Sequence, residues 1–498
     1  MSSIRVTLGG KTTEVQTADG ETLLAALRRV GYSIPASCGG RGRCGKCRVP
    51  VNGVPRLACR LIPQDGDTVE LPERAGGVIL TEADAQTLFV QAGQSGLGAA
   101  VDLGTTTVVA RLYDRSGGAL LDTAGAWNAQ AAYGADVISR IQYTLEQENG
   151  LSELSDRSRE QVWGLLCDGL NRAGRRAEEL HEIVIVGNTV MQHIFDGRSV
   201  RGIAAVPFQP ETLFDDPTGR PLHGVPVRFA PCVAGYIGGD ITAGLLSSGL
   251  AERNGTSLFL DIGTNGEMAL GGAEGFLCCA VASGPAFEGA GISCGMPGID
   301  GAVSHVRYDR GFLYDVVGGV PPKGLCGSGL LDLAAVLLRL GVIAPGGRLL
   351  PPEDVPAELR RYVERDADGN GLFHLTAEVS LTAADVRSLQ LAKAAVAAGI
   401  QVLLERKNLT PEQLDGVYLA GGFGNYLDAN SAMAIGMFPA AMDGKIHPLG
   451  NAALAGASTL ALDGRKWAQL RTIAGTCETI VLSGNAAFNA AFAAHMAF

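Results

Sequence analysis

Apolar and polar positions alternate along the first 60 residues in a way that predicts a small mixed α/β module. Residues 4–8 and 13–15 carry every-other-residue apolar patterns on either side of a Gly-Gly pair, which predicts a β-hairpin. Leucines and a valine at helical spacing then predict a helix over 21–30, with Asp19 as its N-cap. Short strands are predicted at 48–51 and 54–59.

The longer remainder repeats one pattern. Buried strand, tight turn and second strand are predicted over 98–110 and again over 257–270, with Asp102 and Asp261 at equivalent places, 159 residues apart. A repeat at that distance predicts two similar lobes, each a sheet with helices. A third apolar strand runs into a glycine-rich turn at 417–425.

The strongest helix pattern of the repeat region covers 381–406, where Thr382 and Asp385 predict a capping box. The expected fold class is therefore α/β. Its N-terminal strands and helix, together with a cysteine-rich loop at 38–47, resemble a β-grasp ferredoxin-like domain, and a larger two-lobed domain follows. We expect the N-terminal domain at 1–75, a connector at 76–96, the first lobe of the larger domain at 97–250 and its second lobe at 251–498.

Composition narrows the classes of partner. The 498 residues carry a formal charge of −11, which argues against nucleic acid as a partner. Residues 1–75 hold 11 Lys/Arg and 7 Asp/Glu, whereas the rest holds 29 and 44. A basic domain beside an acidic body fits electrostatic docking, and it equally fits two solvated surfaces.

No stretch of 18 uncharged apolar residues and no secretory signal is found, so a soluble cytoplasmic protein without membrane contact is expected. Seven of the 11 cysteines are scattered without metal-ligand spacing, and we expect them to be buried thiols.

The other four cysteines, Cys38, Cys44, Cys47 and Cys59, are crowded as C-x5-C-x2-C-x11-C in a glycine-rich segment. Plant-type two-iron clusters use a similar C-x4-C-x2-C run with a distant fourth cysteine, so a [2Fe-2S] cluster is the favoured interpretation. Tetrahedral zinc and disulfides stay open as alternatives. Glycine patterns that resemble dinucleotide and Walker A loops overlap this segment, but the cysteines already account for those glycines.

The repeated Asp-x-Gly-Thr turns predict a site for ATP and Mg²⁺. Turns rich in Gly and Thr present N–H groups and hydroxyls to phosphates, and an aspartate at the strand end can hold Mg²⁺ through water or position the attacking water. Asp102 and Asp261 are the catalytic candidates. The cofactor-binding candidates are Gly104, Thr105, Thr106, Gly263, Thr264, Asn265, Gly266, Gly421, Gly422 and Gly424.

These motifs resemble those of the sugar kinase, heat-shock protein 70 and actin superfamily. Asp102-Leu-Gly-Thr-Thr is similar to its first phosphate motif, Asp261-Ile-Gly-Thr-Asn-Gly to its second, and Leu419-Ala-Gly-Gly-Phe-Gly to its adenosine motif. Residues 450–456 resemble its second connecting helix. The resemblance covers about 97–498 and implies an actin-like ATPase fold.

An iron–sulfur module fused to this fold resembles the reductive activators of corrinoid-dependent methyltransferases. Further similar segments are Asn128-Ala-Gln, Tyr133-Gly-Ala-Asp-Val-Ile-Ser-Arg140, Val186-Gly-Asn-Thr, Gly235-Tyr-Ile-Gly-Gly-Asp240, Ser283-Gly-Pro-Ala-Phe-Glu288 and Gly324-Leu-Cys-Gly-Ser-Gly329. The family often has a further domain where this chain has only the connector at 76–96.

The resemblance implies ATP-dependent return of one electron to the inactive Co(II) state of a corrinoid protein, which gives Co(I). It also implies an external electron donor, and it leaves a homodimer open. Two other functions fit the same motifs: a small-molecule kinase with a redox-sensing iron–sulfur module, and a nucleotide-timed electron relay without catalysis.

A second group of residues has a structural and a functional interpretation of similar weight. Asn188, Asp240 and Glu267 could serve the nucleotide site or simply cap helices and turns. His193 and His305 are expected in or near the core, away from metal, and Cys278-Cys279 is expected to pack under the second lobe.

Overall fold

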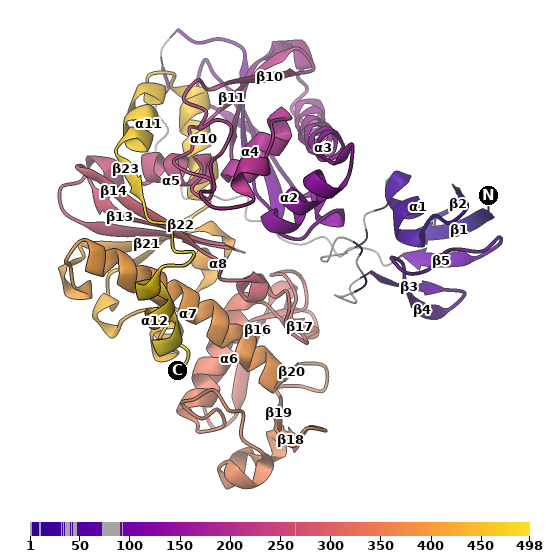
Figure 1. Cartoon of the computed structure of the whole chain (residues 1–498), viewed down its shortest axis with the longest axis vertical. Helices are drawn as coiled ribbons and strands as arrows, with labels where there is room; N and C mark the ends of the chain where they lie inside the picture. The colour runs from indigo at the N-terminus through magenta and orange to yellow at the C-terminus, as the bar shows by residue number, and fades with distance from the viewer. Residues whose placement is uncertain are drawn as a thin grey trace. The chain divides into compact units, whose positions relative to one another are not determined.

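The structure is a computed structural model of the whole chain (Figure 1). It describes residues 2–8, 11–30, 32, 34, 40, 42, 47–71, 90–91, 93–263 and 265–498. The described residues fall into two compact units, one within 2–71 and 90–229 and the other within 230–498. The predicted connector at 76–96 lies mostly outside the described residues. Within the described part of the chain, every helix is too short or too polar to cross a membrane.

The N-terminal module, residues 2–71, is a five-stranded sheet of order β2-β1-β5-β3-β4 with one helix. The predicted hairpin is confirmed, since β1 and β2 pair antiparallel from Ser2↔Thr17 to Leu8↔Lys11. Its elements are β1 (Ser2–Leu8), β2 (Lys11–Thr17), α1 (Leu23–Arg29), β3 (Arg48–Val51), β4 (Val54–Leu57) and β5 (Thr68–Leu71).

Helix α1 begins at Leu23, later than predicted, and Asp19 is not its cap. The Thr22 hydroxyl accepts a hydrogen bond from Ala25 N and is the N-cap. Leu23, Leu24 and Leu27 face the module core, which also contains the side chains of Cys47 and Cys59.

The first lobe, residues 97–229, is built on a six-stranded sheet of order β10-β11-β9-β6-β7-β8. Its strands are β6 (Leu97–Leu103), β7 (Thr107–Asp114), β8 (Leu120–Trp127), β9 (Leu180–Val186), β10 (Thr218–Leu222) and β11 (Val225–Phe229). Its helices are α2 (Val137–Glu146), α3 (Gly150–Arg172) and α4 (Thr189–Asp196).

The second lobe, residues 230–498, is built on a six-stranded sheet of order β22-β21-β12-β13-β14-β23. These strands are β12 (Ser257–Ile262), β13 (Gly266–Gly272), β14 (Gly275–Val281), β21 (Gly416–Ala420), β22 (Ile446–Gly450) and β23 (Cys477–Thr479). Two three-stranded sheets contain β15 (Ala302–Tyr308), β16 (Phe312–Val316), β17 (Gly324–Leu325), β18 (Val363–Arg365), β19 (Gly371–His374) and β20 (Ser380–Leu381).

Helices of the second lobe lie on both sides of its large sheet (Figure 1). They are α5 (Gly239–Ser248), α6 (Gly327–Arg339), α7 (Ala383–Arg406), α8 (Gly421–Tyr426), α9 (Ala429–Ala434), α10 (Ala452–Leu462), α11 (Lys466–Gly475) and α12 (Ala486–Ala494). The predicted capping box of α7 is confirmed at Thr382 and Asp385. Helix α10 packs against α5, where a side chain at Gly456 would clash with the Ala243 carbonyl.

The two lobes share the topology of five strands in each large sheet, as the sequence repeat predicted. In the first, β6, β7 and β8 are successive antiparallel strands and β9 and β11 add in parallel. In the second, β12, β13 and β14 do the same, followed by β21 and β22. Each Asp-x-Gly-Thr turn therefore joins the first two strands of its sheet. The glycines at 421–424 are not a turn, because they form the first turns of α8.

Candidate functional site

The first predicted phosphate loop, Gly104–Thr106, joins β6 to β7, and buried polar side chains donate hydrogen bonds to its backbone carbonyls. Asn128 Nδ2 donates to Gly104 O at 2.7 Å, and Asn128 N donates to Thr106 O at 2.8 Å. A Cβ at Gly104 would lie 2.7 Å from Thr107 O, so only glycine fits this turn. The loop is pre-formed by its neighbours, which is what a phosphate-binding turn requires.

Arg140 and Asn188 bind Thr105 from two different helices. Arg140 Nη2 donates to Thr105 O at 2.5 Å, and Asn188 Nδ2 donates to Thr105 Oγ1 at 3.0 Å. Asn188 is at the same time the N-cap of α4, accepting from Met191 N at 3.0 Å. The two interpretations of Asn188 are thus compatible, since its oxygen caps the helix and its nitrogen binds the loop. Asp102 lies at the end of β6, directly before this loop.

The second predicted loop, between β12 and β13, is a tight turn in which Gly263 N donates to Asn265 O at 2.8 Å. Ser283 Oγ donates to Gly263 O at 3.2 Å. A Cβ at Gly266 would lie 2.9 Å from Val281 Cγ2, which explains the small residue. Thr264 lies outside the described residues.

Three carboxylates gather beside this second loop. Asp261 and Glu267 are directly opposite each other in the β12–β13 register, and Asp240 lies in the first turn of α5. Burial, together with the carboxylates of Asp240 and Asp261, raises the pKa of Glu267 well above its usual range. A buried acid of this kind favours its neutral form unless a cation is present. A cation bound here would offset the repulsion between these carboxylates.

The predicted adenosine segment lies against one of these carboxylates, that of Asp261. Strand β21 pairs in parallel with β12, and Ala420 is opposite Asp261. Gly421 has φ +83°, and a Cβ there would lie 2.6 Å from Asp261 Oδ1. An added Cβ at Gly422 would meet nothing within 4 Å, and Gly424 packs on Leu419. Gly421 is therefore needed for close approach, whereas Gly422 borders open space.

The described part of the iron–sulfur candidate is Cys47 and Cys59, because Cys38 and Cys44 lie outside the described residues. Cys47 is 1% and Cys59 8% exposed, and both belong to the module core. They are brought together across the β3–β4 hairpin, where Ala58 N donates to Cys47 O at 2.9 Å. A Cβ at Gly40 would lie 3.8 Å from the Cβ of Cys59, so Gly40 lies within van der Waals reach of this cysteine. Two shielded thiols beside a glycine fit a cluster site.

Within the described residues, no three His, Cys, Asp or Glu side chains form a group that could hold a metal ion by themselves. The acidic residues of the second loop are accordingly not a closed metal cage. Mg²⁺ typically takes only one or two protein carboxylates and completes its octahedron with water and phosphate oxygens. The donor set at the second loop fits that mode of binding.

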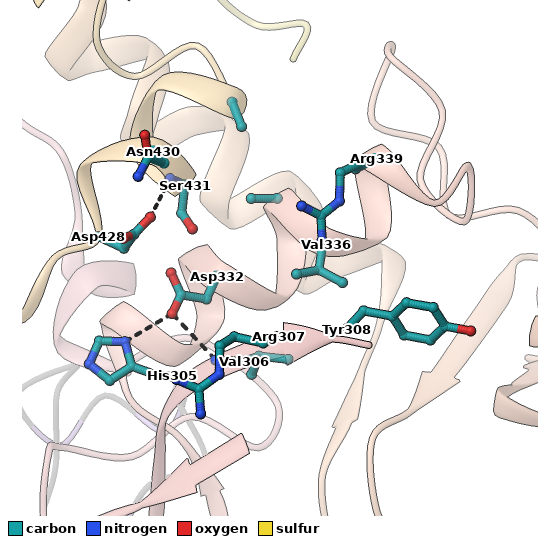
Figure 2. A pocket seen from close by; sticks show the side chains of 12 residues that line it. His305, Val306, Arg307, Tyr308, Asp332, Val336, Arg339, Asp428, Asn430 and Ser431 are labelled. Carbon is teal, nitrogen blue, oxygen red and sulfur yellow. Dashed lines mark hydrogen bonds and ion pairs between the residues drawn. The ribbon is translucent and has the colours of Figure 1, made fainter. Parts of the chain in front are cut away.

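The histidines are held by protein groups, as expected for His193. That side chain is fully buried, its Nδ1 lies 2.7 Å from Thr189 O, and burial lowers its pKa. His305 is less buried and lines a cavity of about 520 Å³ between β15, α6 and α9 (Figure 2). Its Nδ1 lies 3.0 Å from Asp332 Oδ2, and Asp332 is a buried acid on α6. Neither histidine belongs to the nucleotide loops.

Cys278 and Cys279 are buried on β14, as expected, and burial raises the pKa of Cys279 to about 12. They are packed thiols and poor nucleophiles.

Three residues that organise the loops were not among the sequence candidates. Asn128 and Arg140 support the first loop, and Glu288 lies beside the second, where its Oε1 is 3.4 Å from a Cβ built on Gly263. The signal was present, because all three fall in segments that resemble the activator family. Their spacing along the chain did not reveal which loop they would reach.

Three family models match the chain in succession. The 2Fe-2S iron–sulfur cluster binding domain matches residues 6–64, the RACo middle region matches 97–253, and the C-terminal ASKHA domain of RACo matches 255–498. Together they leave only short segments of the chain unmatched. The first model supports a two-iron cluster at the cysteine-rich segment.

Individual relatives carry related names. The chain is 34% identical over 376 residues to the corrinoid activation enzyme RamQ of Eubacterium limosum, covering 72% of this chain and 63% of RamQ. It is 27% identical over 308 residues to the [Co(II) methylated amine-specific corrinoid protein] reductase of Methanosarcina barkeri, covering 57% and 52%. The chain thus spans between half and two thirds of the length of these relatives.

Among solved structures, a reductive activator for corrinoid,iron-sulfur protein superposes with a TM-score of 0.73 at 29% identity. The match covers 100% of this chain and 98% of that one. The likeness therefore extends through the module and both lobes.

Proposed function

The chain belongs to the RACo family, and we propose that it uses ATP to return one electron to the inactive Co(II) form of a corrinoid protein. One observation carries the proposal: a shielded pair of cysteines in the N-terminal module and two tight turns, after β6 and after β12, occur on the same chain. The names of the relatives support the corrinoid protein as the partner.

The four cysteines of the module, Cys38, Cys44, Cys47 and Cys59, are proposed to hold the cluster. A two-iron cluster, when bound, supplies one electron at a time at about −400 mV. The burial of Cys47 and Cys59 excludes water from their sulfur atoms. The electron itself has to come from an external donor.

The two loops are proposed to bind the phosphates of ATP. Thr105, Thr106, Thr264 and Asn265 supply hydroxyl and amide groups for this role, and Gly104, Gly263 and Gly266 suit tight turns. Asp102 and Asp261 are proposed to hold Mg²⁺ through water and to orient the attacking water. Gly421, Gly422 and Gly424 are proposed to face the adenosine.

ATP is needed for an energetic reason. A one-electron gap of about 100–200 mV between cluster and cobalt costs roughly 2–5 kcal/mol. A cation bound at the second loop also offsets the repulsion between the neighbouring carboxylates of Asp240, Asp261 and Glu267. Binding of ATP shifts a conformational equilibrium only through its different affinity for the two conformations.

The test combines the iron-loaded protein, a chemical reductant and a Co(II) corrinoid protein, with and without ATP. The Co(I) absorption band is expected only with ATP, and Asp261→Asn should slow its appearance at least tenfold. Asp415→Asn, which removes a carboxylate from a loop outside the site, is the matched control. Metabolite-dependent ATP turnover without cobalt reduction would replace the proposal by a kinase. Full reduction by Asp261→Asn would instead indicate a nucleotide-timed relay.

A further inference from the structure

Arg28, in the last turn of α1, makes a contact that neither the cluster nor the nucleotide site requires. Its guanidinium carbon lies 5.3 Å from the ring centre of Tyr133, a residue of the first lobe in the same compact unit. Arg157 Nη2, on α3, donates to Arg28 O at 3.1 Å. A cation over a tyrosine face contributes about 0.5–2 kcal/mol, depending on how far it is desolvated.

The contact between Arg28 and Tyr133 is supported by few hydrogen bonds for a buried cation. Nε and Nη2 of Arg28 are buried and donate no hydrogen bond within the described part of the chain. Burial lowers the pKa of Arg28, and Tyr133, Cys47 and Cys59 oppose that change. A buried guanidinium with unused donors is readily lost to water, so this contact can be released. The same cation is within electrostatic range of two proposed cluster ligands.

Tyr133 is connected on its other side to the first phosphate loop. Arg140 donates from Nε to Gly134 O at 3.1 Å and from Nη2 to Thr105 O at 2.5 Å. Gln130 O accepts from Tyr133 N at 2.9 Å, and Arg140 Nη1 donates to Gln130 Oε1 at 3.2 Å. One buried guanidinium thus holds both the loop and the backbone that positions the Tyr133 ring.

We propose that Arg28 is the positioning contact through which the first phosphate loop controls how firmly the iron–sulfur module is held on the first lobe. The inference rests on ATP binding at that loop, as proposed above. A phosphate at Thr105 competes with the carbonyls of Thr105 and Gly134 for the Arg140 guanidinium. Loss of those hydrogen bonds moves Tyr133, and the weakly held Arg28 is released with its module. The surface to which Arg28 binds is therefore the Tyr133 ring of the same chain.

The test is hydrogen exchange of α1 in the iron-loaded full chain, with and without a non-hydrolysed ATP analogue. In the natural protein, the analogue should accelerate exchange of residues 23–29 about five-fold, which corresponds to loss of one cation–aromatic contact. Arg28→Gln and Tyr133→Leu should each show the fast exchange already without nucleotide and no further response. The double variant should be no faster than either single variant, because both remove the same interaction.

Arg29→Gln is the matched control, since Arg29 is the next residue, is half-exposed and pairs with Glu21 in its own module. It should keep the nucleotide response. A second measurement, the midpoint potential of the cluster, should become more negative in Arg28→Gln and not in Arg29→Gln, and Arg28→Lys should restore part of the shift.

Nucleotide affinity is measured in parallel, so that two failures can be told apart. If the analogue does not bind, the proposed function and this inference both fall. If it binds and the exchange of α1 is unchanged or slower, or if Arg28→Gln responds like Arg29→Gln, the inference is overturned while the proposed function stands.

Discussion

Gly421→Ala is the sharpest test of the second-lobe geometry, because one methyl group meets two separate obstacles. Gly421 has φ +83°, which an L-residue adopts only with strain, and the new Cβ would lie 2.6 Å from Asp261 Oδ1. The left-handed backbone costs about 1–2 kcal/mol. Moving the carboxylate off its preferred rotamer adds about 0.5–1.5 kcal/mol. We expect a loss of about 2–3 kcal/mol in the free energy of unfolding of the second lobe.

The change also displaces a proposed Mg²⁺ ligand, so it should weaken nucleotide binding in addition to stability. Unfolding of the second lobe, followed by circular dichroism, should shift down by about 5–10 °C for a unit of this size. Titration with a fluorescent ATP analogue and Mg²⁺ should give an affinity at least tenfold lower. Both measurements are made on the full chain.

Gly422→Ala is the matched control, since its Cβ would meet nothing within 4 Å. Alanine is favoured over glycine inside a helix by about 0.5–1 kcal/mol, so this variant should be as stable as the natural protein or slightly more so. If it nevertheless weakens nucleotide binding, Gly422 faces the ligand as predicted. Equal stability and equal affinity of the two alanine variants would falsify the close approach of Gly421 to Asp261.

Three further predictions follow from individual contacts. Asn188→Ala removes the cap of α4 and the hydrogen bond to Thr105, so it should lower the free energy of unfolding by about 1–2 kcal/mol and also lower nucleotide affinity. Asn188→Asp keeps the cap and should lower nucleotide affinity alone. Unfolding and binding curves that do not separate the two variants in this way would contradict the double role. Cys59→Ala should abolish the cluster absorbance and the bound iron after anaerobic purification, whereas Cys279→Ala should retain both; iron retained in Cys59→Ala would exclude it as a ligand. Burial lowers the pKa of Lys393 from 10.5 to about 8, so its contribution to stability is present above pH 10.5 and lost as the pH falls through 8. In denaturant unfolding, the stability of Lys393→Met relative to the natural protein should therefore rise as the pH is lowered from 10 to 7. A stability difference that does not change with pH would refute the pKa shift.

Much of the architecture could be predicted from local patterns. Alternation specified the β1–β2 hairpin, and the repeated Asp-x-Gly-Thr turns predicted two sheets of one topology. These features are local, because they depend on side-chain period and on turn chemistry within a few residues. The cap of α1 was wrong for a related reason: Asp19 and Thr22 are both good caps, and packing of Leu23 and Leu24 into the module core selects the later start.

What the sequence by itself determined is the inventory of this protein: a cysteine-rich module, two Asp-x-Gly-Thr turns and a glycine segment, in that order. Only the tertiary structure decided which of these residues meet. Gly421 lies against Asp261 because β21 pairs in parallel with β12. Arg140 reaches Thr105 from α2, a helix that packs against α3 and α4. Such contacts depend on strand order and helix placement across long stretches of chain, and burial with the neighbouring carboxylates then raises the pKa of Glu267. Spacing along the chain carries no record of those distances.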